Sequence, residues 1–187
     1  MTDISVYLGS LYPLPDDLAT RLRSITSEQF FRRKDYLVRA GQLSEHVYFV
    51  QQGMLRSFYH KDGKEISARF VREGELCFPI EHIFHHPYGM ETIQALENTQ
   101  TQIIPFKQWL AVYTDFPVFR TIGLRLLEKY IQEHYLRCRA MWMQPALVRY
   151  QWFQENRPEL ATRVQAKLLA SLLGMTNVMY SKLGSSS

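Results

Sequence analysis

The spacing of apolar residues along the chain changes twice. Leu18, Leu22 and Ile25 recur at intervals of four and three, which predicts that roughly the first 30 residues are helical. From Lys34 to about residue 106, short runs of Val, Ile, Phe and Tyr are separated by turn residues. After Lys107 the helical spacing returns and continues to the end. The pattern therefore predicts an α+β protein, with a β region between helical segments.

Regular glycines divide the predicted β region. They fall 10 to 12 residues apart, which is typical of an all-β sandwich or barrel, and they are Gly41, Gly53, Gly63 and Gly74. Asp62-Gly63 predicts a tight hairpin, because both residues tolerate positive φ and the flanking residues alternate between two faces. A short loop or helix is expected around Phe78–Tyr88. Two further strands are predicted at Thr92–Leu96 and Thr101–Phe106.

A helix of about 25 residues is predicted to carry two apolar stripes. One stripe has the 3,4 spacing of a coiled-coil seam and consists of Leu124, Leu127, Ile131, His134, Cys138 and Met141. The other consists of Phe119, Ile122, Leu126 and Tyr130. With two stripes, one can pack on the β region while the other pairs with a second copy of the chain in a homodimer. The alternative is a monomer that buries both faces of the helix.

A stretch of twenty residues near the C-terminus, Ala166–Ser185, has the pattern of a helix-turn-helix. A small residue, Ala170, lets the two helices approach, and Gly174 permits the turn. Apolar residues fill the expected joint, namely Leu169, Leu173, Met175, Tyr180 and Leu183. Thr176 is expected to cap the second helix. An ordinary helical hairpin with a glycine turn is the alternative.

The predicted DNA-contact residues lie mostly on the second of these helices. They are Gln165, Thr176, Asn177, Tyr180, Ser181 and Lys182, whose side chains suit phosphates or base edges. Val178 and Met179 weaken this prediction, because polar groups would be more useful there. The second helix is expected to be short or truncated, since the sequence stops at Ser187.

Composition and charge support a globular protein with a basic C-terminal part. Hydrophobic residues make up 46% of the 187 residues and charged residues 21%. Residues 118–187 hold 10 Lys/Arg and 4 Asp/Glu, whereas residues 1–117 hold 12 and 14. Such an asymmetry is expected of a nucleic-acid-binding appendage, although a solvated basic helix surface gives the same count.

Other classes of protein are disfavoured. No apolar run is long enough to span a bilayer and the N-terminus lacks a signal-peptide pattern, so we expect a cytoplasmic protein without membrane contact. Cys77 and Cys138 stand 61 positions apart and are expected to be small buried hydrophobes rather than a disulfide or zinc site. No His-x-His, G-x-S-x-G, P-loop or paired Cys/His set occurs, so we expect no enzyme, catalytic residue or cofactor.

The order of these elements resembles the Crp/Fnr family of bacterial transcription regulators. The resemblance is carried by Lys34–Gly41, Val47–Gly53, Asp62–Ile66 and Leu172–Thr176. It implies an antiparallel β-roll sensor domain of jelly-roll type over residues 1–116, a dimerisation helix over 117–143 and a helix-turn-helix domain over 144–187. The segment Asn156–Leu160, followed by Arg163 and Val164, is similar to the branch found in Bacteroidetes-type bacteria.

The resemblance also identifies a candidate effector pocket, at Phe78, Glu81, Gly89, Met90 and Thr92. Relatives that bind cyclic AMP have Phe-Gly-Glu-Leu and an Arg-Ser pair at the two ends of this segment. Here Pro79 removes a backbone donor, and Gly89-Met90 lacks the arginine that would neutralise the phosphate. We therefore expect no cyclic AMP binding. The effector, if there is one, is not specified by the sequence.

Three histidines fall in the same segment. On a helix His82, His85 and His86 would share one face, which suits a metal ion or a pH-sensitive charge. A solvated polar face is the interpretation that we favour, and no metal site is predicted.

Taken together, the sequence favours a homodimeric DNA-binding regulator with a β-roll effector domain. The alternative is a β-roll ligand-binding or interaction protein that has lost DNA readout.

Overall fold

The computed structural model describes residues 3–78 and 88–185. The chain divides into two compact units. The first unit comprises Met1–Ser57 and Phe70–Glu128, and the second comprises Phe58–Arg69 and Lys129–Ser187. This division falls within a hairpin and within the longest helix, whereas the predicted domain ranges follow the ends of elements. Those ranges stay a prediction.

Two short helices open the first unit. Helix α1 (Ile4–Leu11) begins at Asp3, whose carboxylate accepts a hydrogen bond from the Ser5 amide at 2.8 Å, and α2 spans Asp16–Ile25. The prediction of helix up to about residue 30 is wrong beyond Ile25. Residues Ser27–Phe31 form strand β1, which pairs antiparallel with β8 (Thr99–Pro105) far along the chain. Local spacing carries no information about that partner.

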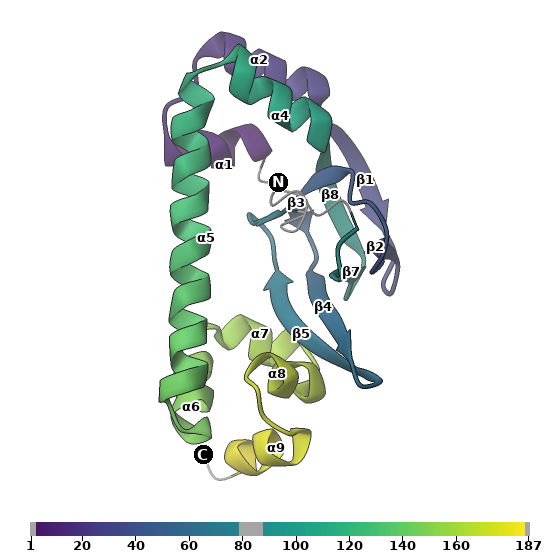
Figure 1. Cartoon of the computed structure of the whole chain (residues 1–187), viewed down its shortest axis with the longest axis vertical. Coiled ribbons are helices and arrows are strands. Elements are labelled where there is room, and N and C mark those ends of the chain that lie inside the picture. Colours follow the sequence, from purple (N-terminus) through teal and green to yellow (C-terminus); the bar gives the residue numbers. More distant parts are fainter. Residues whose placement is uncertain (1–2, 79–87, 186–187) are drawn as a thin grey trace. The chain divides into compact units, whose positions relative to one another are not determined.

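The strands form two four-stranded sheets (Figure 1). The first has the order β1-β8-β3-β6, in which β3 is His46–Gln52 and β6 is Leu76–Cys77. The second has the order β2-β7-β4-β5, with strands Tyr36–Val38, Thr92–Ala95, Leu55–Lys61 and Lys64–Val71. The predicted α+β class is confirmed, and β7 and β8 confirm the two strands predicted after Tyr88. The segment 79–87, where a loop or helix was predicted, lies outside the described residues.

The predicted hairpin is also confirmed. Asp62 and Gly63 connect β4 to β5 with φ values of 51° and 71°, so both turn residues adopt the left-handed conformation. This backbone twist matches that of the flanking strands, which explains why Asp-Gly is favoured at such a turn.

Helix α5 (Val118–Met143) is 26 residues long and follows α4 (Phe106–Asp115). Its predicted second stripe is buried at Phe119, Ile122 and Leu126. Phe119 meets the rings of Trp109 and Tyr113 edge-on at centroid distances of 4.9 and 4.8 Å. These contacts fix the start of α5 in the apolar core of the first unit.

Within the described residues up to Ser185, four helices follow α5. They are α6 (Ala146–Asn156), α7 (Pro158–Arg163), α8 (Ala166–Leu172) and α9 (Asn177–Ser185). Pro145 precedes α6 and Pro158 begins α7, positions at which the missing amide of proline costs nothing. None of the helices within residues 3–78 and 88–185 combines the length and the apolar character that a bilayer crossing requires.

Candidate nucleic-acid interface

Helices α8 and α9 form the predicted helix-turn-helix, joined through Gly174. This glycine has φ of 63°, and its amide donates to the Ser171 carbonyl at 3.2 Å while the Met175 amide donates to the Ala170 carbonyl at 3.0 Å. The pair of bonds is a Schellman ending, which satisfies carbonyls that the end of a helix would leave unpaired. The apolar joint is buried as predicted at Leu169, Ala170, Leu173 and Tyr180.

Thr176 caps α9. Its hydroxyl oxygen accepts a hydrogen bond from the Met179 amide at 3.1 Å, which is the bond expected between a capping threonine and the third residue of the helix. The cap satisfies one of the free amides at the start of α9 and so fixes where the helix begins.

The predicted DNA-contact residues separate into three groups. Asn177, Ser181 and Lys182 are exposed on α9, where Ser181 lies one turn after Asn177 and Lys182 directly follows Ser181. Gln165 is exposed at the start of α8. Thr176 is the cap just described, and Tyr180 is only 7% exposed.

Tyr180 belongs to the joint rather than to the exposed set. Its ring meets that of Tyr150 edge-on at 5.1 Å, and its hydroxyl accepts a hydrogen bond from Gln154 Nε2 at 3.1 Å. Burial raises the pKa of the Tyr180 hydroxyl. The side chain therefore positions α9 against α6.

Arg149 is a structural residue of this region that the sequence pattern did not reveal. From α6 its guanidinium donates to the carbonyls of Gln144 at 2.7 Å, Leu173 at 3.0 Å and Gly174 at 3.4 Å. It thus binds the turn of the helix-turn-helix to the start of α6. No sequence signal pairs Arg149 with acceptors 24 and 25 positions away.

Ser171 was missed for the same reason. Its hydroxyl accepts a hydrogen bond from the Ser67 amide at 2.9 Å and donates to the Glu65 carbonyl at 3.2 Å. Strand β5 stands last in its sheet, so these backbone groups belong to an edge strand. Within the second unit, Ser171 thus ties α8 to the end of the hairpin.

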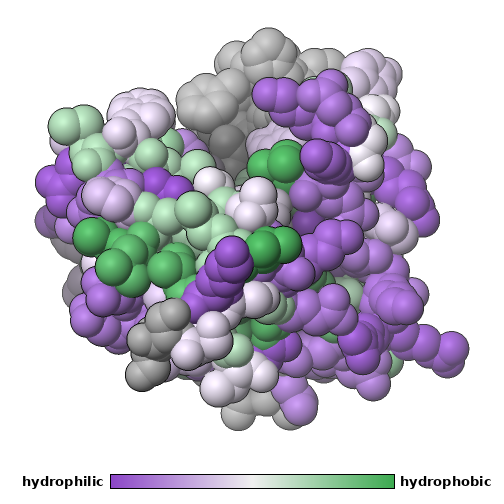
Figure 2. All heavy atoms as spheres, turned by 90° about the horizontal axis from the view of Figure 1, so that it is seen from below, coloured by the Kyte–Doolittle hydropathy of each residue, from purple (hydrophilic) through white to green (hydrophobic). Residues whose placement is uncertain are grey.

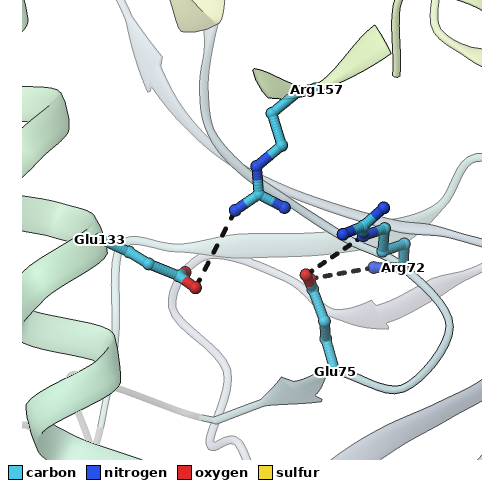
Figure 3. A network of polar contacts seen from close by, with 4 residues as sticks. All are labelled: Arg72, Glu75, Glu133 and Arg157. Atoms are coloured by element: carbon cyan, nitrogen blue, oxygen red, sulfur yellow. Dashed lines mark hydrogen bonds and ion pairs between the residues drawn. The ribbon is translucent and has the colours of Figure 1, made fainter. Parts of the chain in front are cut away.

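Ion pairs add smaller contributions. In the second unit Arg157 lies 3.9 Å from Glu133, and in the first unit Arg72 lies 3.4 Å from Glu75 (Figure 3). Both pairs are partly exposed, so each contributes little to stability.

The predicted dimer seam lies on the exposed side of α5. Leu124, Leu127, Ile131 and Met141 all expose two fifths or more of their surface, whereas Cys138 is half-buried. His134 stacks on Tyr130 with ring centroids 6.0 Å apart, and its Nδ1 lies 3.2 Å from an Arg137 nitrogen. Desolvation, followed by the charge of Arg137, lowers the pKa of His134. The other cysteine, Cys77, is buried as predicted.

Comparison with known proteins shows what this architecture is. Residues 28–115 match the family model of the cyclic nucleotide-binding domain. FixK2 from Bradyrhizobium japonicum superposes with a TM-score of 0.72 at 17% identity, over 87% of this chain and 84% of its own. A protein from Eubacterium rectale assigned to the Crp/Fnr family of transcriptional regulators superposes with a TM-score of 0.72 at 15% identity. The match covers 95% of this chain and 87% of that protein. The chain has the Crp/Fnr fold.

A third structural neighbour is the c-di-GMP-responsive global regulator CLP of Xanthomonas campestris. It superposes with a TM-score of 0.70 at 15% identity, over 89% of this chain and 88% of its own. No protein of curated function matches the chain by sequence. The predicted resemblance to the Crp/Fnr family is thus confirmed, while the assignment to a Bacteroidetes-type branch stays a prediction.

Within the Crp/Fnr fold, the described residues of the predicted effector pocket are engaged in different contacts. Phe78 packs edge-on against Trp109 at 5.6 Å. The Thr92 hydroxyl accepts a hydrogen bond from the Ala40 amide at 3.2 Å, and the Gly89 carbonyl accepts one from Gly41 at 2.8 Å. Met90 is exposed. Gly89 and Thr92 therefore hold the loop around Ala40, while Phe78 joins the core of the first unit.

Glu81 and the three clustered histidines lie outside the described residues. Among the residues that are described, no group of three or more His, Cys, Asp and Glu side chains is arranged to hold a metal ion.

Proposed function

We propose that this protein is a homodimeric, DNA-binding transcription regulator of Crp/Fnr type. The observation that carries the proposal is the face of α9, where exposed Asn177, Ser181 and Lys182 stand on a helix with a threonine cap and a glycine turn before it. Side chains of these types hydrogen-bond to phosphates and to base edges in the major groove. The proposal places the protein in the cytoplasm and assigns it no enzymatic activity.

The charge of the second unit supports this proposal. Phe58–Arg69 and Lys129–Ser187 together contain 11 Lys/Arg and 5 Asp/Glu, whereas the first unit contains 11 and 13. A basic surface attracts the phosphate backbone and releases its condensed counterions. The excess of positive charge thus coincides with the unit that contains the helix-turn-helix.

DNA binding is tested with duplexes selected from a random-sequence pool. Wild-type affinity should fall steeply as salt rises from about 50 to about 200 mM. Lys182→Ala should lower the affinity and reduce the salt slope by about one, because one phosphate is no longer neutralised by an ammonium group. Lys107→Ala, which removes the same charge from an exposed position of α4, is the matched control and should leave both nearly unchanged. Absence of salt-dependent binding would instead favour a β-roll interaction protein without DNA readout.

The homodimer is supported by the exposed seam on α5. Ile131 is 54% exposed on a helix of 26 residues. Covering such an apolar side chain with a second copy of the chain removes apolar surface from water and so stabilises the dimer. We expect sedimentation at tens of micromolar to show a dimer for the wild type and a monomer for Ile131→Asp, with helicity by circular dichroism unchanged. A wild type that stays monomeric contradicts the proposed dimer.

The proposed effector domain does not bind cyclic AMP. Gly89 and Met90 stand where a phosphate-binding arginine and serine would be needed, and the Thr92 hydroxyl is already bonded to the backbone. A thermal-shift measurement should therefore show no stabilisation by cyclic AMP. A clear rise in melting temperature at micromolar cyclic AMP would contradict this part of the proposal.

A further inference from the structure

The centre of the outward face of α9 is apolar. Successive residues of a helix are about 100° apart, so Val178 lies roughly 200° from Tyr180 and roughly 140° from Leu183 around the helix. Tyr180 is buried and Leu183 is half-buried, whereas Val178 is 65% exposed. Val178 therefore points away from the joint more directly than Met179, which follows it and is 46% exposed.

Polar residues surround this valine. Asn177 precedes it, and Ser181 and Lys182 lie one turn further along on the same side of the helix, all of them exposed. Val178 is 65% exposed and is not one of the buried residues of the joint, and a β-branched residue is a poor helix former. Its position is thus explained by neither packing nor helix propensity.

An apolar group ringed by hydrogen-bonding groups complements one feature of the DNA major groove. The C5-methyl group of thymine is the apolar group that the base pairs present there, beside donors and acceptors of the neighbouring bases. Lys182, on the same face, is a candidate phosphate contact, which makes DNA a better match for this face than an apolar protein surface. Contact between an isopropyl and a methyl group removes apolar surface of both from water.

We propose that Val178 reads the 5-methyl group of a thymine in each half-site. This inference rests on the proposed function, because it names the base feature that the same helix recognises. Asn177, Ser181 and Lys182 then set the register of α9 on the duplex, and Val178 discriminates thymine from cytosine at one position.

The experiment replaces thymine by deoxyuridine, which removes the methyl group and leaves the base pairing intact. Each thymine of a half-site selected by the full chain is replaced in turn, and the dissociation constant is measured at fixed salt. At one position the wild type should bind about threefold to fourfold more weakly per methyl removed, as expected for loss of one buried methyl or methylene group.

Two variants assign this effect to a side chain. Val178→Ala should bind the thymine and deoxyuridine duplexes equally. Met179→Ala, the matched control on the adjacent residue, should keep the wild-type preference. Thermal melts followed by circular dichroism should be unchanged for both, since both side chains are exposed.

The outcomes separate this inference from the proposed function. Salt-dependent binding with equal affinity for thymine and deoxyuridine at every position overturns methyl readout and leaves the regulator intact. A preference for thymine that survives in Val178→Ala also overturns the inference, because another residue must then read the methyl group. Failure to bind any duplex, or a protein partner captured by this face, overturns both.

Discussion

The two units use their apolar residues in different ways. In the first unit most large apolar side chains converge in two buried clusters around Phe49 and around Val50. In the second unit many stay exposed, and they include Ile131, Tyr135, Trp142, Met143, Leu147, Val148, Val178 and Met179. Figure 2, which views the end where α6 and α9 lie in Figure 1, shows apolar patches within a hydrophilic surface. The first unit thus buries most of its large apolar side chains, with seam residues such as Leu124 and Leu127 among the exceptions, whereas the second unit leaves many of its own exposed.

Two kinds of contact hold elements together in both units, and one example of each comes from a different unit. In the first unit the rings of Trp109, Tyr113 and Phe119 pack into one cluster. In the second, polar side chains such as Arg149 and Ser171 bind backbone groups of distant elements. A polar bridge requires a specific geometry, whereas an apolar core requires mainly volume and burial. The predictions that follow test this contrast, beginning with the largest effect.

Phe119→Ala should lower the free energy of unfolding by about 3–5 kcal/mol, because it removes a fully buried ring and leaves a cavity. Urea unfolding followed by tryptophan fluorescence measures the change. Val6→Ala, an apolar truncation at an exposed position of the same unit, is the control and should change stability by less than about 0.5 kcal/mol. Equal losses in the two variants would contradict the assignment of the core.

Arg149→Ala should lower the free energy of unfolding by about 2 kcal/mol, since three backbone carbonyls lose a charged donor. Arg149→Lys should recover only part of the loss, because a single ammonium group does not reproduce the planar fork of the guanidinium. Urea unfolding of the full chain, monitored by its helicity in circular dichroism, measures the change in stability of each variant. Full recovery in the lysine variant would mean that charge alone matters at this position.

Thr176→Ala should cost about 1 kcal/mol through loss of the helix cap. Thr176→Ser keeps the hydroxyl and should restore most of the stability. Hydrogen exchange should show faster exchange of the Met179 amide in the alanine variant alone. If exchange is the same in both variants, the cap does not hold the start of α9.

The smallest effect concerns pH. His134 has a folded-state pKa below its ordinary value of 6.5, so the unfolded chain binds the proton more readily. The contribution of His134 to stability is therefore complete above pH 6.5 and is lost as pH falls below that value. His134→Gln should show a smaller drop in melting temperature between about pH 7.5 and about pH 5.5 than the wild type. An equal drop would assign the pH dependence to other groups.

Much of the candidate site followed from local sequence. Ala170, Gly174 and Thr176 occupy their expected places because a tight turn between two helices needs a small residue, a positive φ and a cap within a few positions. The Asp62-Gly63 hairpin followed for the same reason. Tyr180 shows the limit of such reasoning. Apolar spacing predicted it in the joint and its hydroxyl predicted a DNA contact, whereas the structure buries its side chain in the joint.

Long-range partners were beyond the reach of the sequence. The pairing of β1 with β8, the bonds from Arg149 to the turn and the bonds from Ser171 to β5 each join groups at least 24 positions apart. An arginine or serine has the same local pattern whether it is solvated or bound to a distant carbonyl. Only packing brings such groups within hydrogen-bond distance.

The sequence by itself determined the order of the helical, β and helical regions, the positive-φ turns at Asp62-Gly63 and Gly174, and the two apolar stripes of α5, because each depends on neighbours within one or two turns of chain. The tertiary structure decided which stripe of α5 is buried, which residues of α9 face outward and which polar groups anchor the helix-turn-helix. Those features depend on burial and on distances between segments remote in sequence, and a one-dimensional pattern does not contain either quantity.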